Sequence, residues 1–267
     1  MIASLALHLD SKHINYYNVN GDSMKINSIY FSPCGETKKV ADYYSRNLPN
    51  SSIFSITSYQ ERKNLLLDPC DLLILSIPTY AEDIPKIIIP ILKTIKGNHA
   101  IINITYGSIS AGKTLSSVTK VFKHHNIKII GAAIIPTKHC YLPKELLYDF
   151  QPLNQLIQKV NNKDFSSVIL PKEKKHILAN LFPKLRHQIV IKKPQINHQL
   201  CTKCRICIEN CPTNAINDNY NINNKCIRCM GCITKCPEQA ITTSIHPILR
   251  RYLRKGYDKK KEIILYK

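Results

Sequence analysis

From residue 24 onward, short apolar runs alternate with segments whose apolar residues recur every three or four positions. The short runs predict strands over Ile26–Phe31, Ser52–Ile56, Asp71–Ile77, His99–Thr105 and Ile127–Ile135. The longer period predicts helices over Thr37–Leu48, Pro85–Ile95, Lys113–His125 and Leu142–Val160. Because strands alternate with helices, we predict an α/β domain over residues 24–165, with a doubly wound, parallel, five-stranded sheet.

The rest of the chain divides by composition. Residues 1–23 show no clear period, and we expect a weakly structured extension, with Met24 as an alternative start of translation. Residues 166–194 are basic and contain prolines, which predicts a linker. Residues 195–245 hold most of the cysteines, and residues 246–267 form a basic tail whose sequence is compatible with a helix.

Eight of the eleven cysteines lie between Cys201 and Cys236, in two copies of the pattern C-x2-C-x2-C-x3-C-P. In this pattern three close cysteines hold one [4Fe–4S] cluster, and the fourth ligates the other cluster. We therefore predict two clusters, one on Cys201, Cys204, Cys207 and Cys236 and the other on Cys226, Cys229, Cys232 and Cys211. The alternatives are structural zinc, which usually takes two well-separated C-x-x-C pairs, and disulfides, which are rare in the cytoplasm. Because both copies are complete, residues 195–244 resemble a bacterial-type two-cluster ferredoxin, and the resemblance implies a small α+β electron-transfer domain.

The first predicted strand runs into a loop that is typical of a phosphate site. A strand, a loop with Ser32, Gly35 and Thr37, and then a helix N-terminus would hold an anion by hydroxyls, backbone N–H groups and the helix dipole. The alternative is an ordinary βα turn with a helix cap at Thr37. Two further loops, after the third and fourth strands, carry Tyr80 and Tyr106, which suit stacking on a flat ring or ordinary packing.

In strand order and loop positions, residues 24–160 resemble the flavodoxins. The resemblance implies that Ser32, Gly35 and Thr37 bind the phosphate of FMN, with backbone contacts from Cys34 and Glu36. It also implies an isoalloxazine site made by Pro78, Thr79, Tyr80, Thr105, Tyr106 and Gly107. Two residues depart from the pattern, because flavodoxins usually have Thr at the position of Cys34 and because Glu36 adds a negative charge beside the phosphate. As a whole, the chain resembles the flavodoxin–ferredoxin fusion proteins of anaerobic bacteria, the EFR1-type group.

Two of the remaining three cysteines lie outside these loops. Cys70 precedes a buried strand and is expected to pack there. Cys140 follows the fifth strand beside His139, near the expected flavin rim, where packing and a reactive thiol are both open interpretations.

The formal net charge is +20, from 38 Lys and Arg against 18 Asp and Glu. A basic surface can attract an acidic redox partner, and a Lys-rich composition of the whole chain is the alternative explanation. The basic tail is either such a docking segment, a membrane-surface segment or a solvated helix face. No nucleic-acid motif accompanies the charge. No apolar run reaches the ~18 residues of a membrane span, and the N-terminus makes a poor signal peptide, so we expect a cytoplasmic protein.

These patterns lead to three hypotheses about function. The first is an electron carrier that couples FMN to two [4Fe–4S] clusters in one chain and exchanges electrons with a redox partner protein. The second is a flavin-dependent reductase of a small substrate that receives electrons from its own clusters, with Tyr80 or His139 as proton donor. The third is a ferredoxin whose flavodoxin-like domain is empty and only docks a partner.

Overall fold

The computed structural model describes residues 24–142, 148–173, 191–257 and 261–267. The predicted extension 1–23 and most of the predicted linker lie outside this part of the chain. Five parallel strands form the sheet in the order β2-β1-β3-β4-β5, and β8 adds a sixth, antiparallel strand beside β5. Their bounds are β1 Ile26–Tyr30, β2 Ser51–Ser55, β3 Cys70–Pro78, β4 Gly97–Tyr106, β5 Lys128–Pro136 and β8 Ile264–Tyr266. The order 2-1-3-4-5 is that of the flavodoxin-like fold, which confirms the predicted fold class.

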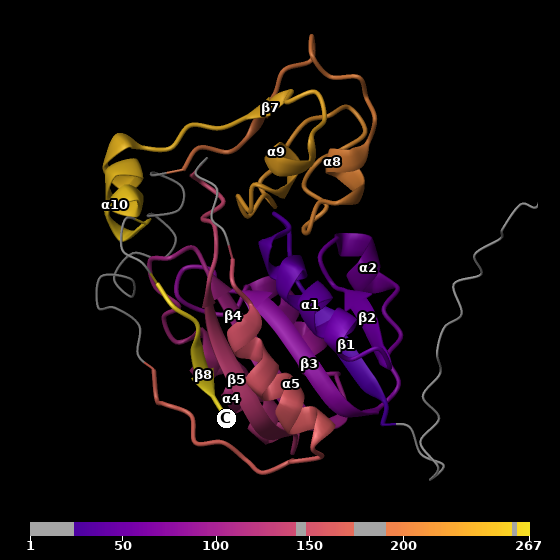
Figure 1. The fold of residues 1–267 in the computed structure, drawn as a ribbon. Helices are drawn as coiled ribbons and strands as arrows, with labels where there is room; N and C mark the ends of the chain where they lie inside the picture. The colour runs from indigo at the N-terminus through magenta and orange to yellow at the C-terminus, as the bar shows by residue number, and fades with distance from the viewer. Residues whose placement is uncertain (1–23, 143–147, 174–190, 258–260) are drawn as a thin grey trace, which may run out of the picture.

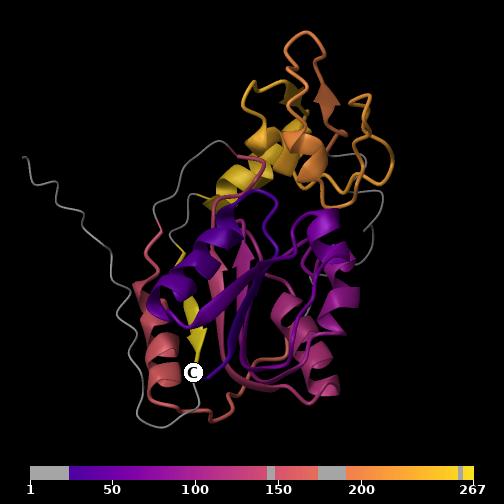
Figure 2. The same cartoon turned by 90° about the vertical axis from the view of Figure 1, so that its right-hand side faces the viewer.

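Helices cover both faces of the sheet, as Figures 1 and 2 show. On one face α1 and α5 bury Val40, Tyr44 and Leu156 against β1, β3 and β5. On the opposite face of the sheet, α4 buries Leu115, Val118 and Phe122 against the same strands. Strand β3 carries Leu72, Leu73, Ile74 and Leu75, all fully buried, as expected for a strand covered on both sides. The helices here are α1 Glu36–Asn47, α2 Tyr59–Lys63, α3 Ile89–Leu92, α4 Thr114–His124 and α5 Asn154–Asn161.

Several elements differ from the prediction, which also missed the short helix α2. The predicted helix Pro85–Ile95 consists of the 3₁₀ turn η1 Lys86–Ile88 and the single turn of α3, because Pro90 removes a backbone donor. Residues 143–147 of the predicted helix Leu142–Val160 lie outside the described part of the chain. Residues 148–150 have no regular structure, and the 3₁₀ turn η2 Gln151–Leu153 leads into α5. The sixth strand was not predicted at all.

The cysteine unit, residues 195–245, lies above the carboxyl ends of the parallel strands (Figure 1). It contains the short helices α8 Ile206–Glu209 and α9 Gly231–Lys235 and a two-stranded ribbon of β6 Gln195–Ile196 and β7 Ile241–Thr242. The chain then forms α10 Pro247–Tyr257 and returns to the sheet as β8. The basic tail is therefore part of the fold: Leu253 is only 3% exposed and packs against Leu142 and Tyr141.

Candidate functional site: two four-thiol cavities beside a larger cavity

Two small cavities in the cysteine unit are each lined by four cysteines. One, here the distal cavity, is lined by Cys201, Cys204, Cys207 and Cys236. The other, here the proximal cavity, is lined by Cys211, Cys226, Cys229 and Cys232. These are the two crossed sets that the motif predicts. Four thiols around an apolar hollow fit a [4Fe–4S] cluster, in which each iron takes one thiolate. Within the described ranges, no group of three or more His, Cys, Asp or Glu side chains forms a single-ion site.

The backbone repeats at the two cavities as the sequence does. Lys203 and Arg205 have φ of 58° and 64°, and Arg228 and Met230, 25 residues further on, have 54° and 64°. Left-handed residues let a tight loop turn its N–H groups inward, where they can bond cluster sulfurs and tune the potential. Ala215, Ile216, Ala240 and Ile241 are almost fully buried around the cavities and shield them from water.

Burial raises the pKa values of two thiols that line the proximal cavity. It raises the pKa of Cys229 well above its usual range and that of Cys232 to about 12, because desolvation disfavours a thiolate. In the protein without iron these groups are therefore thiols at neutral pH. Iron ligation requires thiolates, so cluster assembly in the proximal cavity must release protons.

A larger cavity of about 280 Å³ lies between the carboxyl edge of the sheet and the cysteine unit. It is lined by ten of the eleven residues expected to contact FMN: Ser32, Cys34, Glu36, Thr37, Pro78, Thr79, Tyr80, Thr105, Tyr106 and Gly107. The eleventh, Gly35, precedes α1 with φ 90°, a left-handed conformation that favours glycine. The structure thus brings the three loops together, because parallel strands end at the same edge. The role of these residues in flavin binding stays a prediction.

The loop after β1 is held by hydroxyl contacts. The backbone N–H of Ser32 donates to Thr57 Oγ1 (2.8 Å), and Ser32 Oγ accepts from the N–H of Lys38 (2.9 Å). Thr37 and Thr105 join the first and third loops through their hydroxyls, 2.7 Å apart. An α-helix leaves its first N–H groups without intrahelical partners, so the start of α1 beside this loop can accept an anion.

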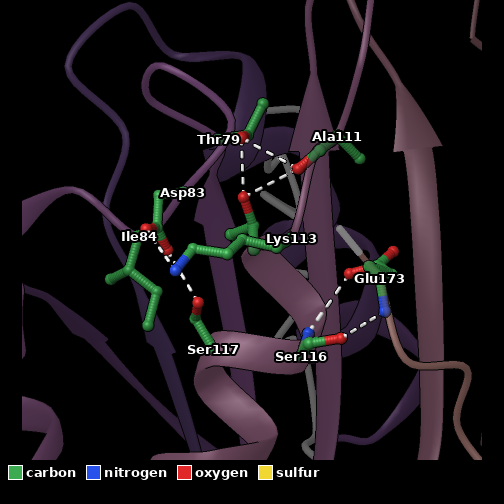
Figure 3. Close-up of polar contacts among 9 residues, drawn as sticks. Thr79, Asp83, Ile84, Ala111, Lys113, Ser116, Ser117 and Glu173 are labelled. Carbon is green, nitrogen blue, oxygen red and sulfur yellow. Dashed lines mark hydrogen bonds and ion pairs between the residues drawn. The ribbon is translucent and has the colours of Figure 1, made fainter. Parts of the chain in front are cut away.

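The loop after β3 is tied to α4, as Figure 3 shows. Thr79 Oγ1 lies 2.6 Å from Thr114 Oγ1 and donates to the carbonyl of Ala111 at 3.1 Å. The Asp83 carboxylate accepts from the hydroxyl of Ser117 at 2.7 Å and pairs with Lys113. These contacts fix the loop that presents Tyr80 to the cavity.

The two predicted stacking tyrosines both reach the cavity but differ in surroundings. Tyr80 packs edge-on against Phe31, with ring centroids 6.0 Å apart, and burial raises the pKa of its phenol well above the usual value. Burial also raises the pKa of Tyr106, and it lowers the pKa of His139 to about 4. At neutral pH both tyrosines are therefore protonated and His139 is uncharged. The His139 ring packs so closely on Gly107 that a Cβ there would lie 2.3 Å from it.

Several lining residues were not predicted, because they come from distant segments. Arg228 belongs to the cysteine unit, and α10 contributes Leu249, Tyr252 and Leu253. The apolar stripe of the tail helix was the one signal in the sequence that could have indicated a covering helix.

Two buried polar atoms beside the cavity have no hydrogen-bond partner among the described residues. They are Nε of Arg228, a donor, and Oε2 of Glu36, an acceptor, while Glu36 Oε1 pairs with Lys39 at 2.9 Å. Lys39 thus balances the charge by which Glu36 departs from the flavodoxin pattern. A ligand carbonyl, such as those of a flavin ring, would satisfy the Arg228 Nε donor. The residues present therefore fit a flavin.

The proximal and larger cavities share a wall. Ile227, Arg228 and Cys229 line both of them. Direct hydrogen bonds attach this wall to the sheet: Cys34 Sγ donates to the carbonyl of Cys229 at 2.9 Å, and Tyr141 Oη donates to that of Arg228 at 3.1 Å. A cluster ligand therefore belongs to the surface of the larger cavity.

Comparison with known proteins supports the cysteine unit directly. Residues 194–217 match the family model of the 4Fe-4S binding domain, which spans Cys201 to Cys211. A flavoprotein from Lactobacillus acidophilus, crystallised in complex with FMN, is 19% identical, with a TM-score of 0.33, covering 42% of this chain and 93% of that one. A candidate flavoprotein from Bacteroides eggerthii is 17% identical, with a TM-score of 0.32 and coverages of 42% and 88%. No curated protein matched the chain. Among the described residues, no helix is both long and apolar enough to cross a membrane.

Proposed function

We propose that this chain is an electron-transfer protein that couples FMN, held in the larger cavity, to two [4Fe–4S] clusters. The observation that carries the proposal is the shared wall: Cys229, a predicted cluster ligand, lines both cavities. Only one layer of residues separates the two cofactor positions, so electrons can pass within the chain. In this proposal the chain belongs with the EFR1-type flavodoxin–ferredoxin fusions.

The two clusters differ in their access to the outside. Cys204 of the distal cavity is exposed, whereas Cys229 of the proximal cavity is only partly exposed and lines the larger cavity as well. We therefore place the exchange with a partner protein at the distal cluster, and the proximal cluster next to the flavin. The excess of 38 basic over 18 acidic residues favours an acidic partner.

When bound, FMN would accept one or two electrons, and each cluster would exchange one. The chain's own residues would position these groups: Ser32 and Thr37 would hold the phosphate, Tyr80 and Tyr106 would contact the ring, and Arg228 would donate a hydrogen bond to it from the side of the proximal cavity. His139, uncharged at neutral pH, and Tyr80, with its raised pKa, are both poor acids. The lowered pKa of His139 and the raised pKa of Tyr80 are therefore more in keeping with a carrier than with a reductase that must protonate a substrate.

The first test is anaerobic purification with iron, sulfide and flavin measured per chain. About eight irons and one FMN support the proposal, because each cubane carries four irons. Four or fewer irons after full reconstitution would contradict two clusters, and iron without flavin would leave only the docking hypothesis.

The second test follows the route of the electrons. A one-electron photoreductant is added to the protein, and cluster and flavin absorbance are recorded together. The Cys204→Ser variant should slow flavin reduction at least about tenfold while FMN stays bound. Cys70→Ser is the matched control, because Cys70 lies at the start of β3, away from both cysteine sets. Equal rates in the wild type and Cys204→Ser would reject the distal cluster as the entry point.

A further inference from the structure

Two cysteines outside both cluster motifs meet at the wall of the larger cavity. Cys34 lies in the loop after β1, and Cys140 lies in the loop after β5. Both line the same cavity, and Cys140 lies near enough to Cys34 to raise the pKa of the Cys34 thiol. They are separated by more than a hundred positions in the sequence, and the common edge of the parallel strands brings them together.

The pair also touches a cluster ligand. The Cys34 thiol donates to the carbonyl of Cys229 at 2.9 Å, so one backbone group lies between this sulfur and a ligand of the proximal cavity. Tyr80 and Tyr141 lie close enough to all three sulfurs to be affected by their charge. Cys70, by contrast, lies at the far end of β3, where its thiol reaches only the carbonyl of Lys96 at 3.7 Å.

We propose that Cys34 and Cys140 are a redox-active pair, which forms an intramolecular disulfide and stores two electrons beside the proximal cluster. Its substrates are disulfides. The inference rests on the proposed function for the source of its electrons, because the two clusters together supply the two that a disulfide needs.

Both directions balance. In oxidation, the Cys140 thiolate attacks a disulfide substrate and releases one substrate thiol. Cys34 then attacks the mixed disulfide, the Cys34–Cys140 bond forms, and the second substrate thiol leaves. In reduction, the bond would take two electrons, one from each cluster when both are bound and reduced, and two protons from solvent, which gives two thiols. We assign the first attack to Cys140 because the Cys34 thiol is already held by Cys229.

The first experiment measures the pair without using the clusters as donors. The holoprotein is equilibrated anaerobically in buffers of reduced and oxidised glutathione, quenched in acid, alkylated and mapped by mass spectrometry. We expect one peptide pair, joined through Cys34 and Cys140, that titrates as a two-electron couple with about 30 mV per tenfold change in the ratio of oxidised to reduced pair. Cys34→Ser and Cys140→Ser should each abolish it, and Cys70→Ser should retain it. Independent glutathionylation of the two cysteines, or no cross-link over the whole range, would overturn the proposal.

The second experiment tests the electron source. The oxidised holoprotein receives a one-electron photoreductant, and loss of the cross-link is followed in the wild type and in Cys204→Ser. At least about tenfold slower opening in the variant supports delivery through the clusters. Equal rates, with a cross-link that still forms in glutathione buffer, would overturn the proposed electron route and leave the pair itself established.

Discussion

Replacing Gly231 by alanine tests how closely the cysteine unit is docked on the sheet domain. A Cβ at this position would lie 2.8 Å from the carbonyl oxygen of Pro33 and 3.1 Å from its Cβ. Backbone cannot rotate away as a flexible side chain can, so the two loops must separate by a few tenths of an ångström. The corresponding residue of the first repeat is Ile206, which shows that the cluster loop itself accepts a side chain there.

Two effects of opposite sign decide the outcome. Alanine at the first residue of α9 gains up to about 1 kcal/mol of helix propensity over glycine. Overpacking a close contact costs about 1–3 kcal/mol. We expect the steric term to dominate, with a net loss of roughly 1–2 kcal/mol in the free energy of unfolding and a Tm lower by about 2–8 °C.

The assay compares the thermal unfolding of Gly231→Ala and wild-type holoprotein under anaerobic conditions, with iron content as a check that the clusters remain. Ile206→Ala serves as the comparison, since Ile206 occupies the same place in the other repeat and lines the distal cavity. The proposed coupling adds a second readout: the dissociation constant of FMN should rise about 5–30-fold, the equivalent of the same 1–2 kcal/mol. A Tm equal to or above that of the wild type would refute the close docking of the two loops.

Three further predictions concern the interface, the crossed ligation and pH. Arg62 donates hydrogen bonds to the carbonyls of Ile56 and Thr57 and, across the interface, to the carbonyl of Pro212. Arg62→Ala should therefore lower the free energy of unfolding, measured by denaturant titration, by about 2 kcal/mol. A loss below about 0.5 kcal/mol would mean that water already replaces these contacts. Cys211 lies in the first motif, but crossed ligation assigns it to the proximal cluster. Cys211→Ser should therefore remove the proximal cluster and lower the iron content from about eight to about four atoms per chain. Loss of the EPR signal of the distal cluster alone would contradict crossed ligation. Burial lowers the pKa of His139 to about 4, from about 6.5 in the unfolded chain. Between these two pKa values the unfolded state binds more protons than the folded state. The free energy of unfolding should therefore fall by about 1.3 kcal/mol when the pH is lowered from 7.5 to 5.5. His139→Gln should remove that part of the pH dependence, and an unchanged slope would assign it elsewhere.

The parts that could be predicted from the sequence are those governed by local spacing. The crossed thiol sets followed from two complete motifs. The ten cavity residues followed from the resemblance of three loops to those of flavodoxins, and the common edge of the parallel strands brings these loops together. Periodicity located β1 to β5 within two residues, because each of these strands is flanked by polar turns or an amphipathic helix.

The parts that could not be predicted depend on tertiary contacts. Strand β8 has only three residues, and the edge of β5 stabilises it, so no local pattern marks it. Arg228 was visible only as a residue between two ligands, and nothing in the motif indicates that it lines a second cavity. The proximity of Cys34 to Cys140 likewise requires the strand order, which places β1 and β5 on either side of β3 and β4.

The antiparallel pairing of β8 with β5 has a consequence for the order of assembly. Helix α10, which contributes Leu249, Tyr252 and Leu253 to the cavity, is attached at both ends: Ile245 bridges to Ile191 before it, and β8 pairs with the sheet after it. Contacts between residues so distant in sequence form late in folding, since a long loop must close first. The sheet and its three loops can therefore form while the cavity is still open on this side. A bulky cofactor could enter at that stage, before Leu249, Tyr252 and Leu253 of α10 complete the lining of the cavity.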